Sequence, residues 1–229
     1  MYLFNKFWSP NIPVTILGYR TPPFKLYPNF NFISLASKQE SANEWAKHHY
    51  DFFDSLNDDH FIWTVEDSYL LRPVNVNIVS SLKAFITDPT VGRISLINPI
   101  EEHPTSVIKS ENDYDIIEAT QDADSRIAVV WTIWNRQYAL RHLVEGWSPW
   151  DVELKGSQLA KNDDWRIIGS QNKHAIDYAS PHRKPGRGLP HGILDFRYTN
   201  KPHLMLDHQS LYELMSLGMI NEHLQLIKS

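Results

Sequence analysis

The stretch "FIWTVEDSYLL" (61–71) joins an apolar run to two adjacent acids and then returns to apolar residues. Its first residues are aromatic and β-branched types that favour a β-strand, which we expect over 61–65. Glu66 and Asp67 follow directly at the end of this strand. Carboxylates are costly to bury unless an arginine, a helix N-terminus or a divalent metal ion meets them. The role of these two acids therefore depends on the fold around the strand.

Segments with strand-like and helix-like patterns alternate around this stretch. Strands are expected at 12–19, 32–37, 61–65 and 91–97, with helices at 40–56 and 76–86 between them. Apolar residues recur at helical spacing in both helices, and Ser41 is a suitable N-cap for the first. This alternation is typical of an α/β fold with a mostly parallel sheet flanked by helices. Ligands of such sheets bind outside the carboxyl ends of the strands, where Glu66 and Asp67 lie.

The second half of the chain begins with a polar stretch over 98–125, which we expect to be a long loop with one edge strand. After it we expect strands at 126–134, 165–169 and 173–179, and helices at 135–144, 148–160 and within 207–228. The helix that starts at 148 has a clear start signal. Ser148 can cap it, Pro149 suits the first helical position, and Asp151 has a capping-box spacing. No internal repeat or low-complexity tract interrupts the pattern, and we expect one domain over 1–229.

The composition limits the class of protein. A chain of 229 residues, 42% of them hydrophobic, can bury one sizeable core. The net charge of -5 argues against a general nucleic-acid binder. The chain has no cysteine, which excludes disulfides, thiolate metal sites and cysteine nucleophiles. It also has no signal-peptide core and no apolar run of about 18 residues. We therefore expect a cytoplasmic protein without a membrane span.

The acid pair is the first of three polar clusters that could carry chemistry. Glu66 and Asp67 are oxygen ligands of the kind that Mg²⁺ or Mn²⁺ takes, and such a metal often bridges to a substrate diphosphate. The alternative is a structural role, in which the acids pair with the nearby Arg72 or cap a helix.

The second cluster is "SPWDVELKGS" (148–157) at a helix start. Trp150 and Glu153 are three residues apart and share a face, whereas Asp151 can satisfy the free N–H groups of the first turn. Asp151 is thus expected to be structural, and Glu153 is free to take a proton from an attacking hydroxyl. The alternative is an acidic first turn that only complements the helix dipole.

The third cluster is the basic Pro/Gly-rich stretch "SPHRKPGRGLPHG" (180–192). Its cations suit phosphate binding, and His182 could be a metal ligand; the alternative is a solvated surface loop. The cations are Arg183, Lys184 and Arg187. No P-loop, dinucleotide-binding glycine motif or serine nucleophile elbow occurs in the chain.

Two of these stretches together resemble GT-A fold glycosyltransferases of the bacterial and phage type that build capsule and lipopolysaccharide. "FIWTVEDSYLLRPVN" (61–75) resembles their strand–acid–turn segment. "VVWTIWNRQYALRHLVEGWSPWDVELKGS" (129–157) resembles a helix with the pattern IW-R-x-Y-L followed by SPW-acid-x-E-x-x-GS, and is the more specific match. The usual acidic signature is Asp-x-Asp. Here Ser68, a weaker metal ligand, stands at its third position.

The resemblance implies a nucleotide-diphosphate sugar as donor and a glycan-like acceptor, as in polysaccharide biosynthesis. Residues 1–97 would bind the donor, 98–206 would carry the acceptor and catalytic half, and 207–229 would form C-terminal helices. Glu153 would be the general base, with Asp151 as the second candidate. The other implied roles are a Mn²⁺ or Mg²⁺ ion held by Glu66, Asp67 and His182, diphosphate binding by Arg183, Lys184 and Arg187, and acceptor contacts by Trp150 and Trp134.

Two alternatives remain open from the residues. Arg20 after the first expected strand is compatible with another nucleotide-using enzyme, such as a nucleotidyltransferase. Ser68 is compatible with a GT-A-like domain that binds a nucleotide sugar without turnover. The sequence identifies neither the sugar and base of the donor, nor the acceptor, the linkage and the oligomeric state.

Overall fold

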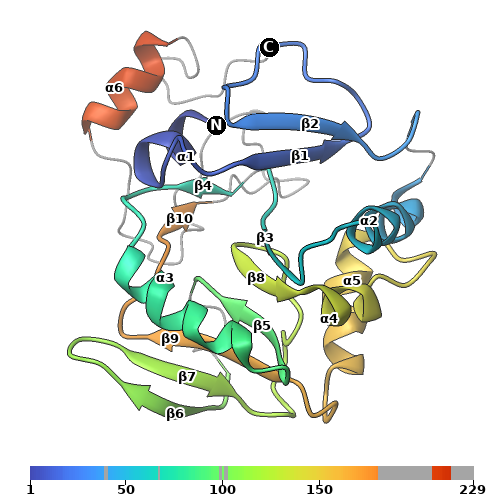
Figure 1. Ribbon diagram of the computed structural model, residues 1–229, viewed down its shortest axis with the longest axis vertical. Coiled ribbons are helices and arrows are strands. Elements are labelled where there is room, and N and C mark those ends of the chain that lie inside the picture. Colours follow the sequence, from blue (N-terminus) through green and yellow to red (C-terminus); the bar gives the residue numbers. More distant parts are fainter. Residues whose placement is uncertain (39–40, 67, 98–99, 101–102, 180–207, 218–229) are drawn as a thin grey trace, which may run out of the picture. The chain divides into compact units, whose positions relative to one another are not determined.

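The computed structural model in Figure 1 describes the whole chain except residues 39–40, 67, 98–99, 101–102, 180–207 and 218–229. Contacts divide the chain into two units. The larger unit consists of Ile12–Val65 and Asn75–Ala175. The smaller unit consists of Met1–Asn11, Glu66–Val74 and Ile176–Ser229. The single domain expected over 1–229 and its internal boundaries stay predictions.

A six-stranded sheet forms the centre of the larger unit. Its order is β3 (His60–Trp63), β8 (Thr132–Asn135), β5 (Val91–Ser95), β9 (Arg166–Gln171), β7 (Asp115–Ala119) and β6 (Thr105–Ser110). Within it β5 and β9 pair in parallel, and every other neighbouring pair is antiparallel. The mixed α/β class is confirmed, but the prediction of a mostly parallel sheet is wrong for this sheet.

Two features of the chain account for the antiparallel pairs. The polar stretch expected to be a loop with one edge strand forms the β6–β7 hairpin, and β7 pairs with β9. β8 lies between β3 and β5 and runs antiparallel to both. The expected parallel arrangement occurs between β5 and β9, and in a separate two-stranded sheet of β1 (Val14–Gly18) and β2 (Phe30–Ser34).

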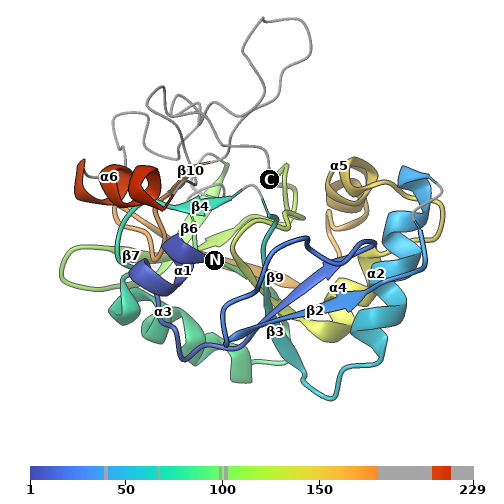
Figure 2. The same ribbon diagram turned by 90° about the horizontal axis from the view of Figure 1, so that it is seen from above.

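The helices of the larger unit begin close to where the sequence predicts. They are η1 (Ala42–Glu44), α2 (Trp45–Asp54), α3 (Val76–Lys83), η2 (Ala84–Thr87), α4 (Arg136–His142) and α5 (Pro149–Leu159). Asn75 caps α3 by accepting from Ile78 N at 3.3 Å, and Asn135 caps α4 by accepting from Tyr138 N at 3.1 Å. Figures 1 and 2 show α2, α4 and α5 gathered together, and α3 contacts β9.

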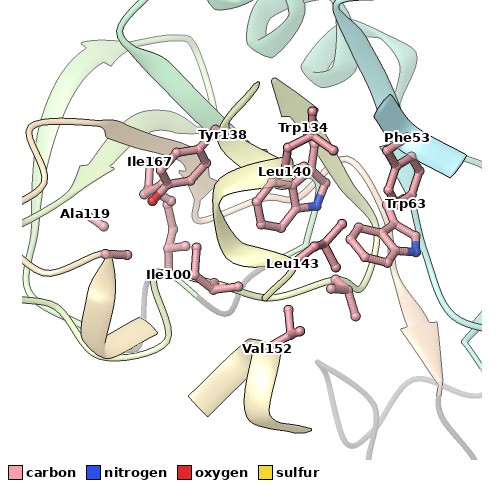
Figure 3. Close-up of a cluster of buried hydrophobic side chains, with 14 of the residues drawn as sticks. Phe53, Trp63, Ile100, Ala119, Trp134, Tyr138, Leu140, Leu143, Val152 and Ile167 are labelled. Atoms are coloured by element: carbon pink, nitrogen blue, oxygen red, sulfur yellow. The ribbon is translucent and has the colours of Figure 1, made fainter. Parts of the chain in front are cut away.

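The main core of the larger unit joins the sheet to α2, α4 and α5. Figure 3 shows Trp63 and Trp134 from the sheet beside Leu140 of α4 and Val152 of α5. The ring of Tyr138 lies directly over Gly92, where a Cβ atom would come within 2.5 Å of the ring carbons. This contact explains why the second position of the buried strand β5 carries no side chain.

The smaller unit contains α1 (Tyr2–Phe7), β4 (Tyr69–Leu70), β10 (Tyr178–Ala179) and α6 (His208–Ser216). β4 and β10 form an antiparallel pair. Lys6 Nζ of α1 lies 2.7 Å from Glu213 Oε2 of α6, and the Tyr2 hydroxyl donates to the same carboxylate. α6 confirms a helix in the C-terminal stretch. None of the helices among the described residues has the length and apolar character needed to cross a membrane.

Candidate active site

The start of α5 is fixed by the capping box that the sequence predicts. Ser148 Oγ accepts from Asp151 N at 3.2 Å, and Asp151 Oδ2 accepts from Ser148 N at 3.1 Å. Lys155 lies 2.9 Å from the same carboxylate. Hydrogen bonds from Lys155 and Ser148 lower the pKa of Asp151 to about 2. Asp151 is therefore a helix cap and a weak base, which confirms its structural role.

Glu153 lies on the same turn in a different environment. Its side chain is partly buried, and Oε1 accepts a hydrogen bond from Val129 N at 3.1 Å. Burial raises the pKa of Glu153 above its ordinary value, while the bond from Val129 and the positive charge of Arg93 act in the opposite direction. Of the two acids, Glu153 is the stronger base.

Glu153 also lies at the border between the two faces of α5. Val152 and Gly156 belong to the buried face. On the other side, Trp150 and Leu154 are 68% and 71% exposed. Residues three and four apart on a helix are neighbours, so Glu153 has the exposed Trp150 on one side of it and the core on the other.

The segment before β8 holds α5 along three successive turns. Ser157 Oγ accepts from Ile127 N at 3.0 Å and donates to Ile127 O at 3.3 Å. Arg126 Nε donates to Ala160 O, the C-cap of α5, at 2.7 Å. Together with the hydrogen bond from Val129 to Glu153, these contacts fix the position of α5 along its axis and its rotation about that axis, relative to residues 126–129.

Sequence reasoning missed this docking, because the apolar run at 126–134 predicts a strand over its whole length. Only its end pairs in the sheet, as β8. Two residues could have indicated that this segment packs against α5: Arg126, which starts the apolar run, and Ser157, which lies on the buried face of the helix. Both residues are buried and donate or accept hydrogen bonds with backbone atoms, and Arg126 also pairs with Asp163 at 3.3 Å.

The two tryptophans expected to contact the acceptor differ in position. Trp150 is exposed, so its side chain is accessible from solvent. Trp134 is 1% exposed, and its ring centroid lies 5.9 Å from that of Tyr138 and 6.1 Å from that of Trp63. The structure therefore gives Trp134 a packing role in the core (Figure 3).

The predicted donor end of the site lies only in part within the described residues. Glu66 is exposed in a turn of the smaller unit, and Ser68 is buried with no hydrogen-bond partner for its Oγ among the described residues. No group of three or more histidine and acidic side chains that could hold a metal ion occurs in the described part of the chain. The predicted residues that lie outside it are Asp67, His182, Arg183, Lys184 and Arg187.

Comparisons with known proteins add no relative. No protein-family model, no curated protein and no solved structure matches the chain.

Proposed function

We propose that the protein is a glycosyltransferase that moves a sugar from a nucleotide-diphosphate sugar to a hydroxyl group of a glycan-like acceptor. The observation that carries this proposal is the position of Glu153. Its carboxyl group is held by the N–H of Val129 at the edge of a helix face that presents the exposed ring of Trp150. An exposed aromatic ring beside a fixed carboxylate suits a sugar, since the ring stacks on its apolar face and the carboxylate takes a hydroxyl proton.

The chemistry assigned to Glu153 is proton transfer during displacement. The acceptor oxygen forms a bond to the anomeric carbon of the donor sugar, and its proton passes to the Glu153 carboxylate. The bond from the anomeric carbon to the phosphate oxygen breaks, and the nucleoside diphosphate leaves with the electron pair. Asp151 does not compete for this role, because its pKa of about 2 makes it a poor proton acceptor.

The donor end of the proposed site rests on the predicted residues. Glu66, Asp67 and His182 would hold a divalent cation, and Arg183, Lys184 and Arg187 would bind the diphosphate. A bound Mn²⁺ or Mg²⁺ ion would neutralise negative charge on the diphosphate. The structure supplies one supporting observation at this end, the Ser68 hydroxyl. It has no partner among the described residues, and its oxygen is of the ligand type that hard cations accept.

A thermal stability screen tests the donor class. The protein is melted with each nucleoside diphosphate and its common sugar derivatives, in Mn²⁺, in Mg²⁺ and with chelator. A ligand at 100 times its Kd adds about 2.7 kcal/mol of stability, which a melting curve resolves. We expect one base family to raise the Tm in a metal-dependent way.

Matched variants make the screen specific. Glu66→Gln should weaken the Tm shift, whereas Glu145→Gln, which changes an exposed acid of the larger unit, should leave it intact. The absence of a shift with every nucleotide would overturn the donor assignment. A shift without any glycosylated product by mass spectrometry, over a panel of acceptors, would favour binding without turnover.

A further inference from the structure

One peptide unit connects Arg93 to Glu153. Arg93 Nη1 donates to the carbonyl oxygen of Ala128 at 3.1 Å. Val129 N, which belongs to the same peptide unit, donates to Glu153 Oε1 at 3.1 Å. A guanidinium group on β5 and a carboxylate on α5 are thus joined through a single C–N bond of the backbone.

The guanidinium group of Arg93 is buried and therefore needs a negative charge nearby. Its side chain is 1% exposed, and among the described residues its Nη2 donates to another carbonyl oxygen, that of Ser125, at 3.5 Å. Within the described part of the chain it forms no direct salt bridge. Among the described residues, the ionisable groups that act on its charge are Tyr138 of α4, Glu153 of α5 and Arg126, of which Glu153 is the carboxylate. A buried charge is expensive without an opposite charge nearby.

We propose that Arg93 is a positioning residue for Glu153 that acts through the peptide unit Ala128–Val129. A cation on the carbonyl oxygen polarises the peptide unit and makes its N–H a stronger donor. This donor fixes Oε1 of Glu153 in place and favours the ionised carboxylate, so that the second oxygen is left for the acceptor proton. The catalytic consequence rests on the proposed function, whereas the coupling between the two side chains does not.

The competing explanation is that Arg93 only anchors the turn before β8. The two explanations differ in what happens when Glu153 takes up a proton. If the peptide unit couples the groups, the guanidinium of Arg93 responds to that proton; the amide of Val129, which bonds to Glu153 directly, responds under both explanations. If Arg93 is only an anchor, its resonances are indifferent to the charge on Glu153.

The test is an NMR titration of the full chain with ¹³C-labelled glutamate carboxyls and ¹⁵N, with Glu153→Gln to assign the signal. We expect the Val129 amide and the Arg93 guanidinium to titrate with the midpoint of the Glu153 carboxyl, and this step to vanish in Glu153→Gln. An Arg93 guanidinium signal that does not follow the Glu153 carboxyl in the wild type would overturn the proposal. The titration needs no variant at position 93, so it tests the proposal even if such a variant does not fold.

Substitutions at position 93 then measure the strength of the coupling. Arg93→Met should raise the pKa of Glu153, because a positive charge that favours the carboxylate is lost. Arg93→Lys should raise it less, since the charge remains. Arg166→Met, a control on the neighbouring strand β9, should leave it unchanged. An unmoved Glu153 midpoint in a folded Arg93→Met protein would contradict the proposal, and the absence of sugar transfer would contradict only the proposed function.

Discussion

Two acids two residues apart on α5 have different roles because they point in different directions. The spacing from Ser148 alone predicts that Asp151 is a cap, and the structure confirms this. The sequence also predicts that Glu153 is not used for capping, but not what fixes it, because its partner Val129 lies 24 residues away along the chain. Local patterns identify contacts within a helix turn, whereas contacts between distant segments require the fold.

The contact between Gly92 and Tyr138 predicts a specific loss of stability. In Gly92→Ala the new methyl group would lie 2.5 Å from the ring carbons of a fully buried tyrosine. We expect urea unfolding to show a loss of about 1–3 kcal/mol, the usual cost of overpacking a core. Gly156→Ala is the control, since its methyl group would lie 3.4 Å from Ile127 and alanine favours a helix. Equal stability of the two variants would contradict the packing described for β5.

His49 predicts a dependence of stability on acid. It is buried and stacks on Trp45, with ring centroids 3.9 Å apart, and burial lowers its pKa to about 4 from the usual 6.5. Between pH 6.5 and pH 4, His49 is therefore protonated in the unfolded chain but neutral in the folded chain. The free energy of unfolding falls as the pH is lowered through this range. Linkage gives a loss of about 2 kcal/mol between pH 7 and pH 5 from this residue.

The check on His49 is urea unfolding of wild type and His49→Phe at both pH values. The variant should lose less stability on acidification by about the amount assigned to His49. The variant should still lose the stability that depends on His142, because burial lowers the pKa of His142 to about 4 as well. The same acid sensitivity in wild type and variant would show that His49 is not neutral in the fold.

At the level of elements, α5 combines a start that the sequence predicts with a docking that it does not. Ser148, Pro149 and Asp151 mark the first turn by residue type and spacing alone. The docking depends on Arg126 and Ser157, which replace sheet pairing by contacts to the helix. An apolar run predicts burial correctly, but it does not tell whether a strand or a helix provides the partner.

The cap of α5 gives a prediction at this scale. Ser148→Ala removes the hydroxyl that accepts from Asp151 N, and we expect a loss of about 1 kcal/mol in chemical unfolding. Ser80→Ala is the matched control, because Ser80 is exposed and its hydroxyl only donates to Val76 O within α3. A cost for Ser148→Ala no greater than that for Ser80→Ala would contradict the role of the capping box.

For the molecule as a whole, most segments were predictable and their order in the sheet was not. Strands and helices follow from local periodicity, whereas parallel pairing was inferred from the alternation of elements. That inference fails at β8 and β7, since the direction of a strand depends on its neighbours in space and these two follow no helix crossover. At the site, Glu153 and Trp150 lie on one helix as the sequence predicts, and their roles stay predictions. Trp134 was expected to contact the acceptor, but its indole is buried in the core.

The sheet order predicts a pattern of hydrogen exchange. All five residues of β5 are buried and both of its edges are paired, whereas β6 is an edge strand with four of its six residues exposed. Protection follows burial and pairing, so amides of β5 should exchange much more slowly than those of β6. Peptide-resolved exchange by mass spectrometry gives this comparison directly. Protection of β6 equal to that of β5 would contradict the order of the sheet.

The central claim is that Glu153 is the base of a sugar transferase, and a comparison of two acidic residues tests it most directly. Once a donor is identified, the transfer rate is measured for wild type, Glu153→Gln and Asp151→Asn at saturating donor. We expect Glu153→Gln to keep the fold and donor binding but to lose about 10²–10⁴-fold in kcat, as the loss of a general base does. Asp151→Asn should lose stability and retain most of the rate. Full activity in a folded Glu153→Gln protein would contradict the account.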